Sequence, residues 1–539
     1  MHVIMLTVAS TLKIQLPYID YSSIAPELIL SGAALVSLVG SSLTHKRELT
    51  WPYTAVGVVA SAVAGFWSYH LFDEVRSHGA TAQVAGAIAQ DGFSTFLMVL
   101  ISVSLLLSLL VAQGVFYRAG TRGPEFSSLL LLSSTGAMFM ASANDLIVVF
   151  LGLEILSIAL YVLVGFERSK APSQEGAMKY FILGSFSSAI FLYGIALVYG
   201  ATGSTNLAEI SSFLARNTLT SNGVLLAGMT LILVGLGFKV AAVPFHFWTP
   251  DVYQGAATSV TGFMAGVAKA AGFAALLRIF YVPFSTLSLD WRPEVMALAV
   301  ASMVIGAVLA VTQRDVKRML AYSSINHAGF ILIGLSAVSA QGISDSLYYL
   351  FAYSVMIIGT FGVVSLVSAS QGNFEGTLPV SGLRGLSRRS PVLALTLAVF
   401  LVAQAGAPFT TGFLAKFSVI SAAVQNRDYW LAVVAMMTAV VAVFFYLRMA
   451  FAIYADRGEL ATASSGSAMD VSASEGTTSD GDEQGQLGDL MVAEESDVDT
   501  YRPPVATLVG IGIAMAFTIF FGVFSSPLVS FAHQATLLH

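Results

Sequence analysis

The chain has 539 residues, of which 56% are hydrophobic and only 10% are charged, and its formal net charge is −6. This charged fraction is less than half of the ~25% that soluble domains usually carry, which excludes an ordinary water-soluble protein. The chain has no cysteine and only eight histidines, which are scattered, so it cannot ligate an iron–sulfur cluster through thiolates and we expect no metal site.

Apolar runs long enough to cross a membrane recur along the whole sequence. A bilayer core of about 30 Å requires roughly 20 apolar residues per helix, and we expect an all-α polytopic membrane protein with about fourteen transmembrane helices. The expected spans are residues 24 to 43, 53 to 72, 93 to 117, 126 to 142, 146 to 165, 176 to 199, 223 to 248, 257 to 281, 294 to 311, 321 to 340, 345 to 368, 391 to 424, 429 to 455 and 505 to 526.

The loops between these spans indicate how the chain is oriented. Lysine and arginine lie mainly in the loops that follow odd-numbered helices. The positive-inside rule then predicts that both termini lie outside the cytoplasm. The basic clusters at Arg314 to Arg318 and at Arg384 to Arg389 are most simply interpreted as topology anchors.

One carboxylate, Glu154 in LGLEILSIAL, lies deep within an expected span. Alone in lipid it would be protonated, whereas beside a lysine it would be ionised. We therefore expect Glu154 to be the counter-charge of a neighbouring lysine, either Lys179 or Lys239.

Four cations lie well within apolar runs, and all four are lysines: Lys179, Lys239, Lys269 and Lys416. A buried lysine can release its proton near neutral pH, whereas arginine effectively cannot. Each costs roughly 2.5 to 3.5 kcal/mol at a helix centre on insertion scales, so four of them indicate a use in ion transfer. Lys179, near the start of its run, fits an alternative equally well, in which its ammonium snorkels to the interface.

Two of these lysines lie in runs that a proline interrupts. Lys239 is followed by Pro244, and Lys416 follows Pro408 in a run too long for one straight span. Proline removes an N–H group and frees carbonyls within the membrane. Broken helices in corresponding places of two halves are typical of an ion path at the interface of an inverted repeat, which we expect here.

Two histidines add groups that titrate near neutrality. His327, in AYSSINHAGF, lies a turn inside an apolar run and is a candidate proton relay. His246, in VPFHFW, fits a relay and a structural or interfacial role equally well.

The segment from 456 to 499 holds twelve of the 31 acidic residues and one of the 25 basic residues. It is rich in serine and glycine and has little aromatic content, so it cannot bury enough surface to fold alone. We expect a disordered cytoplasmic loop at 456 to 504.

Several segments resemble the antiporter-like membrane subunits of proton-pumping NADH-quinone oxidoreductase (respiratory complex I), and most closely subunit N. The matching segments, in the order of the family, are FLGLEILSIALYVLVGF, EGAMKYFILGSFSSAIFLYG, GFKVAAVPFHFWTPDVYQGA, AGVAKAAGFAALLR, QRDVKRMLAYSSINHAGF and GFLAKF. Lysine at 416 resembles subunits N and L more than subunit M, and no long lateral helix follows the last span, which favours N. The resemblance assigns proton translocation to Glu154, Lys179, Lys239, Lys269, His327 and Lys416.

The resemblance also implies a domain organisation. Helices 1 to 3 would occupy residues 1 to 125, and two inverted five-helix repeats would occupy 126 to 281 and 294 to 455. The acidic loop at 456 to 504 would separate them from helix 14 in 505 to 539.

The same resemblance implies partners, cofactors and a location. The chain would be a non-redox subunit of a translocase in the bacterial plasma membrane, without catalysis of its own. It would bind no cofactor, whereas NADH, FMN, iron–sulfur clusters and quinone would belong to partner subunits. Its partners would be subunit M, small membrane subunits and the bilayer, with no nucleic acid.

Two alternatives stay open from the sequence. A subunit of a Mrp-type cation/proton antiporter shares the lysine and glutamate pattern. A membrane-embedded enzyme, such as a lipid-linked transferase, is disfavoured because the loops lack clustered carboxylates and a phosphate-binding glycine loop.

Overall fold

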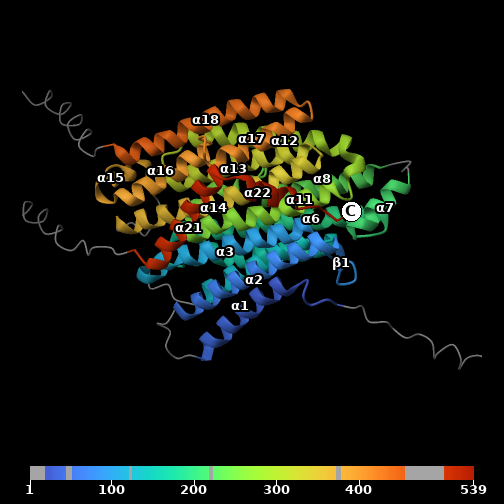
Figure 1. The fold of residues 1–539 in the computed structure, drawn as a ribbon, viewed down its shortest axis with the longest axis horizontal. Coiled ribbons are helices and arrows are strands. Elements are labelled where there is room, and N and C mark those ends of the chain that lie inside the picture. Colours follow the sequence, from blue (N-terminus) through green and yellow to red (C-terminus); the bar gives the residue numbers. More distant parts are fainter. Residues whose placement is uncertain are drawn as a thin grey trace, which may run out of the picture.

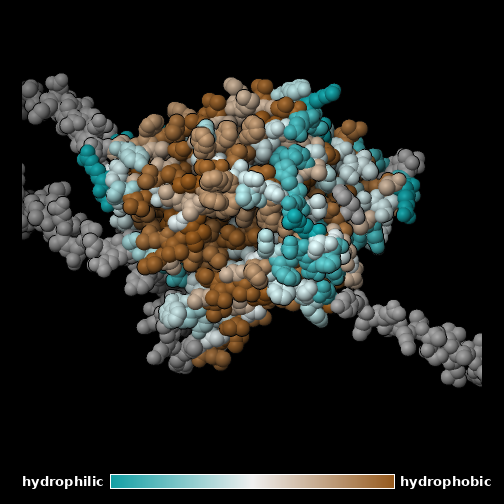
Figure 2. All heavy atoms as spheres, in the orientation of Figure 1, coloured by the Kyte–Doolittle hydropathy of each residue, from teal (hydrophilic) through white to brown (hydrophobic). Residues whose placement is uncertain are grey.

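The computed structural model describes residues 19–43, 51–119, 124–217, 222–371, 378–455 and 503–538. Long helices run roughly side by side, with the short helix α15 (Leu386–Arg389) at one end of the bundle and α7 (Leu207–Arg216) and β1 at the other (Figure 1). Between these two ends the visible surface carries a broad hydrophobic band (Figure 2). This arrangement fits helices that cross a bilayer with their loops in water.

Within the described residues, eleven helical segments are long and apolar enough to cross a membrane, which confirms the all-α polytopic class. The eleven are α1 (Ala25–Leu43), α2 (Trp51–His78), α3 (Gly92–Ala119), α5 (Leu146–Val164), α6 (Ala171–Thr202), α10 with η1 and α11 (Thr258–Tyr281), η2 with α12 (Ser285–Thr312), α13 (Val316–Ser336), α14 (Ala340–Ser370), α18 (Tyr429–Tyr454) and α21 (Val505–Val523).

The remaining expected spans are shorter or less apolar. α4 (Pro124–Ser142) lies at the fourth expected position, but it is rich in buried serines and is not among the eleven. The expected spans 223 to 248 and 391 to 424 are each interrupted. The pieces of the first are α8 (Gly223–Lys239) and α9 (Trp248–Gly255), and those of the second are α16 (Pro391–Ala405) and α17 (Thr411–Gln425).

The centre of the bundle is formed by two elements that other helices enclose. α14 and the composite helix at 258–281 are fully buried across their most apolar windows. The composite helix consists of α10 (Thr258–Phe263), the π-helical turn η1 (Met264–Ala268) and α11 (Lys269–Tyr281). Helices that are apolar on all sides are expected in such a position.

Some local features differ from expectation. A two-stranded hairpin, β1 (Thr81–Gln83) and β2 (Ile88–Gln90), interrupts the otherwise helical chain. Its turn contains Val84, Ala85 and Gly86 with positive φ angles, and no β signal in the sequence predicted it. The short helices η3 (Val380–Leu383) and α22 (Ser526–His533) were not expected either.

The first basic cluster is more than a topology anchor. α13 begins at Val316, earlier than expected, because the Asp315 carboxylate accepts a hydrogen bond from the Arg318 backbone N–H and caps the helix. Lys317 is therefore drawn inside the protein, where it is fully buried and donates to the Ala256 carbonyl at 2.6 Å.

A buried ion pair connects three distant parts of the chain. Arg278 of α11 forms two hydrogen bonds to the Asp91 carboxylate, at 2.8 and 2.9 Å. The backbone N–H of Leu538 donates to the same carboxylate at 2.8 Å. Asp91 therefore has a partner for both oxygens although it is fully buried. The expected acidic loop, by contrast, lies at residues 456–502 outside the described residues.

Candidate functional site

Lys239 is the last residue of α8 and lies at the first helix break. Its ammonium donates to the Ser157 hydroxyl at 2.8 Å and to the Tyr180 hydroxyl at 3.3 Å. The residue is only 6% exposed. The last carbonyls of a helix carry partial negative charge, so the end of α8 is a favourable place for a cation.

Glu154 lies on α5, one turn before Ser157. Its buried Oε1 has no hydrogen-bond partner among the described residues. A cavity of about 10 Å³ beside them is lined by Ser157, Tyr161 and Lys239 among others, which is room for about one water molecule. Lys239 is thus joined to α5 through Ser157, one turn along the helix from Glu154.

Lys179 lies in a different environment. Its side chain is 41% exposed, and its ammonium forms ion pairs with Glu175 at 2.6 Å and with Asp251 at 2.7 Å. Asp251 also pairs with Arg318 of α13 at 2.6 Å. Of the two lysines considered as neighbours of Glu154, Lys239 is the one that hydrogen-bonds to α5, through Ser157, while Lys179 belongs to a half-exposed cluster that joins α6, α9 and α13.

Lys269 is the first residue after the π-helical turn η1 and is 2% exposed. Its ammonium donates to the Ser324 backbone carbonyl at 2.6 Å and also to the Ser324 hydroxyl. π-helical turns are frequent at functional sites. A Cβ atom placed on Gly272 would lie 3.3 Å from Cγ of Lys239, so this glycine allows the end of α8 to pack closely against α11, three residues beyond Lys269.

His327 on α13 is fully enclosed and uses both ring nitrogens. Nδ1 shares a hydrogen bond of 2.6 Å with the Tyr349 hydroxyl, and Nε2 shares one of 3.0 Å with the Tyr446 hydroxyl. The Tyr446 hydroxyl also hydrogen-bonds to Ser323. Hydroxyl and neutral imidazole groups both donate and accept, which is the property that a proton relay requires.

Lys416 on α17 reaches back to the end of α16 at the second helix break. Its ammonium donates to the carbonyls of Gln404 and Ala405, each at 2.9 Å. Pro408 has no N–H to bond the carbonyl of Gln404 four residues earlier, so this carbonyl is left for the lysine. Gly406 ends α16 with a φ of +95°, and a Cβ there would lie 3.2 Å from Cδ of Lys416. The absence of a side chain at Gly406 thus leaves the space that the Lys416 side chain occupies.

A series of polar contacts connects the central lysine to Lys416. Ser324 binds Lys269. The preceding residue, Ser323, hydrogen-bonds to Tyr446. Tyr446 donates to Oε1 of Gln404 at 3.4 Å, and the backbone carbonyl of Gln404 accepts from Lys416. Tyr446 therefore lies at the junction of the two lysines and the histidine.

The helix-break residues lie where the sequence places them, but His246 stands apart. Pro244, after a cis peptide bond, lies between α8 and α9, and Pro408 lies between α16 and α17. His246 is buried, its Nδ1 has no partner among the described residues, and its ring lies against Phe247. It does not belong to the contact series.

A buried carboxylate near His327 was missed from the sequence. Asp345 on α14 is 4% exposed. Its Oδ1 accepts from Gln341 at 2.9 Å, while its Oδ2 has no partner among the described residues. It lies one turn from Tyr349, the partner of His327. The expected span began at 345, which put this carboxylate at the membrane edge, whereas α14 begins at Ala340. The spacing of Asp345, Tyr349 and Tyr353 on one helix face was a signal that could have found it.

Metal binding has no geometric support in the part of the chain that the structure describes. No group of three or more histidine, aspartate or glutamate side chains converges there. The groups assembled at the two helix breaks are amines, carboxylates, hydroxyls and an imidazole, all of which can transfer protons.

Comparison with known proteins identifies relatives along most of the chain. The sequence pattern described as "NADH:quinone oxidoreductase/Mrp antiporter, TM" matches residues 143–442. NADH-quinone oxidoreductase subunit N of Trichlorobacter lovleyi is 41% identical over 446 residues, covering 82% of this chain and 89% of that protein. Subunit N of Mycobacterium bovis is 39% identical over 476 residues, covering 80% and 88%.

Solved structures share the fold. A chain of respiratory complex I from Thermus thermophilus superposes with a TM-score of 0.70 at 28% identity, covering 95% of this chain and all of that one. A chain of the Mrp complex from Dietzia superposes with a TM-score of 0.78 at 21% identity, covering 95% and 96%. At that identity the second likeness concerns the fold alone.

Proposed function

This chain belongs to the NADH:quinone oxidoreductase/Mrp antiporter family, in its subunit N group, and we propose that its buried lysines carry protons across the membrane for a respiratory complex I. The protein is a proton-translocating membrane subunit of that multisubunit NADH-quinone oxidoreductase. The iron–sulfur clusters then reside in other subunits, because this chain has no cysteine to ligate them.

The observation that carries the proposed route is the contact series from Lys269 through Ser324, Ser323, Tyr446 and Gln404 to Lys416. Each member is buried. The lysines and hydroxyls can exchange protons, whereas the Gln404 amide and the Ser323–Ser324 peptide position the groups on either side of them. Because both lysines are enclosed, a charge on one of them is felt by the other more strongly than it would be in water. A proton taken up at one site therefore favours release at the next.

The Glu154–Lys239 pair supplies the first charge of this row. Lys239 donates to Ser157 on the helix of Glu154, and the stem of Lys239 packs against Gly272, one turn from Lys269. Changing the charge of Glu154 therefore changes the preference of Lys239 for a proton, and that change is passed to Lys269. The half-exposed cluster of Lys179 and Asp251 lies nearer the cytoplasmic loops and suits proton uptake.

We assign proton release, on the opposite side of the membrane, to residues of α14. His327 hydrogen-bonds to Tyr349, and Asp345 lies one turn from Tyr349 toward the N-terminal end of α14. The free Oδ2 of Asp345 is a ready acceptor for a proton leaving this histidine. In this orientation the loops with the basic clusters face the cytoplasm and both termini face outward.

The inverted repeat at 126–281 and 294–455 remains part of the proposal. Its support is that each proposed half contains one broken helix, and that the lysine of each break lies at the C-terminal end of the preceding helical piece. Lys239 ends α8 itself, and Lys416 binds the last carbonyls of α16. Negative helix ends that face a cation at a break are typical of transporter repeats.

Of the alternatives, the Mrp-type antiporter shares the family pattern and the fold, whereas subunit N relatives match at about 40% identity over most of their length. The test uses whole complex reconstituted in vesicles, with NADH oxidation and acidification measured together. Lys269→Ala and Lys269→Arg should both assemble and lose most pumping, because arginine keeps the charge but cannot release it. Normal pumping by Lys269→Arg would refute a titrating role.

A further inference from the structure

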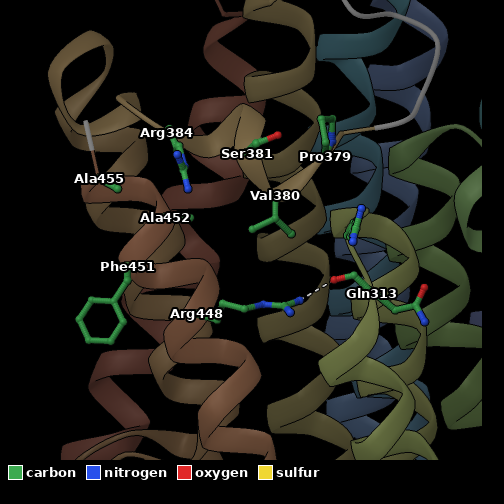
Figure 3. Close-up of a pocket in the computed structure, with 10 residues that line it drawn as sticks. Gln313, Pro379, Val380, Ser381, Arg384, Arg448, Phe451, Ala452 and Ala455 are labelled. Atoms are coloured by element: carbon green, nitrogen blue, oxygen red, sulfur yellow. Dashed lines mark hydrogen bonds between the residues drawn. The ribbon is translucent and has the colours of Figure 1, made fainter. Parts of the chain in front are cut away.

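A pocket of about 520 Å³ lies at the loop end of the bundle, between the end of α12, η3 and the end of α18 (Figure 3). Three arginines line it: Arg314, Arg384 and Arg448. We propose that this pocket binds the anionic phosphodiester headgroup of a membrane phospholipid, with the acyl chains lying along α18.

The walls of the pocket are fixed by backbone hydrogen bonds. The N–H of Val380 donates to the carbonyl of Arg314 at 2.8 Å, and the N–H of Gly385 donates to the carbonyl of Ala455 at 3.0 Å. These bonds tie η3 to the start of α13 on one side and to the end of α18 on the other. The arginines therefore project from a closed frame rather than from a free loop.

The positive charge in the pocket is not neutralised within the described part of the chain. No carboxylate there forms an ion pair with Arg314, Arg384 or Arg448. The nearby Asp315 does not line the pocket, and its Oδ1 caps α13. Arginine guanidinium groups match phosphate oxygens well because they present several donors in one plane.

The side chain of Arg448 is held in place across the pocket by hydrogen bonds. Its two terminal nitrogens donate to the carbonyls of Val311 and Gln313, at 2.6 and 2.5 Å, and the side chain extends across the pocket toward Gln313 (Figure 3). Its Nε is buried and has no hydrogen-bond partner among the described residues. A buried donor without a partner costs free energy, which an anionic oxygen in the pocket would recover.

The surface beyond the pocket distinguishes a lipid from other anions. Phe451, 71% exposed, lines the pocket, and the exposed side chains of Phe444, Val440 and Met437 continue along the same face of α18 at helical spacing. This column offers an apolar track to acyl chains. The acidic segment that follows α18 is rich in serine and glycine, so it has few apolar side chains to pack against this column. A free phosphate has no apolar group at all.

The test measures lipid binding by the purified, delipidated complex, independently of pumping. Short-chain phosphatidylglycerol and phosphatidylcholine are titrated separately, and bound lipid is counted by native mass spectrometry while the melting temperature is recorded. We expect phosphatidylglycerol, and not phosphatidylcholine, to bind tightly and to raise the melting temperature. Arg384→Gln and Arg314→Gln should each weaken phosphatidylglycerol binding about fivefold. The matched control is Arg388→Gln, since Arg388 does not line the pocket.

Several outcomes would overturn the lipid site. One is phosphatidylglycerol binding by Arg384→Gln and Arg314→Gln that equals that of the control, and another is equal binding of phosphatidylcholine. Competition by millimolar inorganic phosphate would identify a free-phosphate site instead. A complex lacking residues 460 to 498 that binds phosphatidylglycerol much more tightly than the full chain would identify the acidic segment as the occupant.

Discussion

Replacing Tyr446 with phenylalanine should interrupt the contact series between Lys269 and Lys416 without disturbing the packing. The ring is kept, so the buried volume is unchanged, but the hydroxyl that meets Ser323, His327 and Gln404 is lost. Leaving buried polar partners unpaired costs about 1–3 kcal/mol. If that free energy is added to the barrier for proton transfer, the rate falls by a factor of roughly 5 to 160.

The assay is proton pumping by complex reconstituted in vesicles, divided by the rate of NADH oxidation in the same sample. The matched control is Tyr348→Phe, because the Tyr348 hydroxyl is buried but has no hydrogen-bond partner among the described residues. We expect Tyr446→Phe to assemble and pump poorly, and Tyr348→Phe to pump normally. If both variants pump like the unmodified complex, the contact series is structural and protons take another route.

Three further perturbations test other parts of the molecule. Glu154→Gln should strongly reduce pumping while Glu154→Asp retains part of it, since only the latter keeps the charge near Lys239; equal pumping by both would contradict this reasoning. Asp345→Asn should slow proton release to the outside, measured with a pH dye on the outer surface, with normal assembly; unchanged release would exclude Asp345 from the route. Arg278→Met should cost about 3–5 kcal/mol because it leaves Asp91 buried without its cation, which would appear as less assembled complex on native gels and a lower melting temperature.

The broken helices and their lysines could be predicted from the sequence because lysine and proline are costly in lipid. Lys239, Lys416 and the prolines beside them stood out in apolar runs for that reason. The structure adds why the pairs belong together: at the second break, the carbonyl that Pro408 leaves free is the one that Lys416 binds.

The residues that link the lysines could not be predicted in the same way. Tyrosine, serine and glutamine are common in membrane helices and carry no large insertion cost, so nothing in a run marks Tyr446 or Gln404 as special. Their role depends on α13, α16 and α18 meeting at one point. Lys317 was misinterpreted for a related reason, since its sequence context is a basic loop and only the cap at Asp315 draws it inside.

The three-part contact at Asp91 has a consequence for how the protein is made. Asp91 leaves the ribosome first, Arg278 follows 187 residues later, and Leu538 follows Asp91 by 447 residues. Until Arg278 is inserted, this carboxylate lacks its cation, and its hydrogen bond from Leu538 can form only after the whole helical bundle from Gly92 to Val523 has been synthesised. Closure of this end of the bundle is therefore a late event in biogenesis, and deletion of the segment around Leu538 would affect that step before any effect on transport.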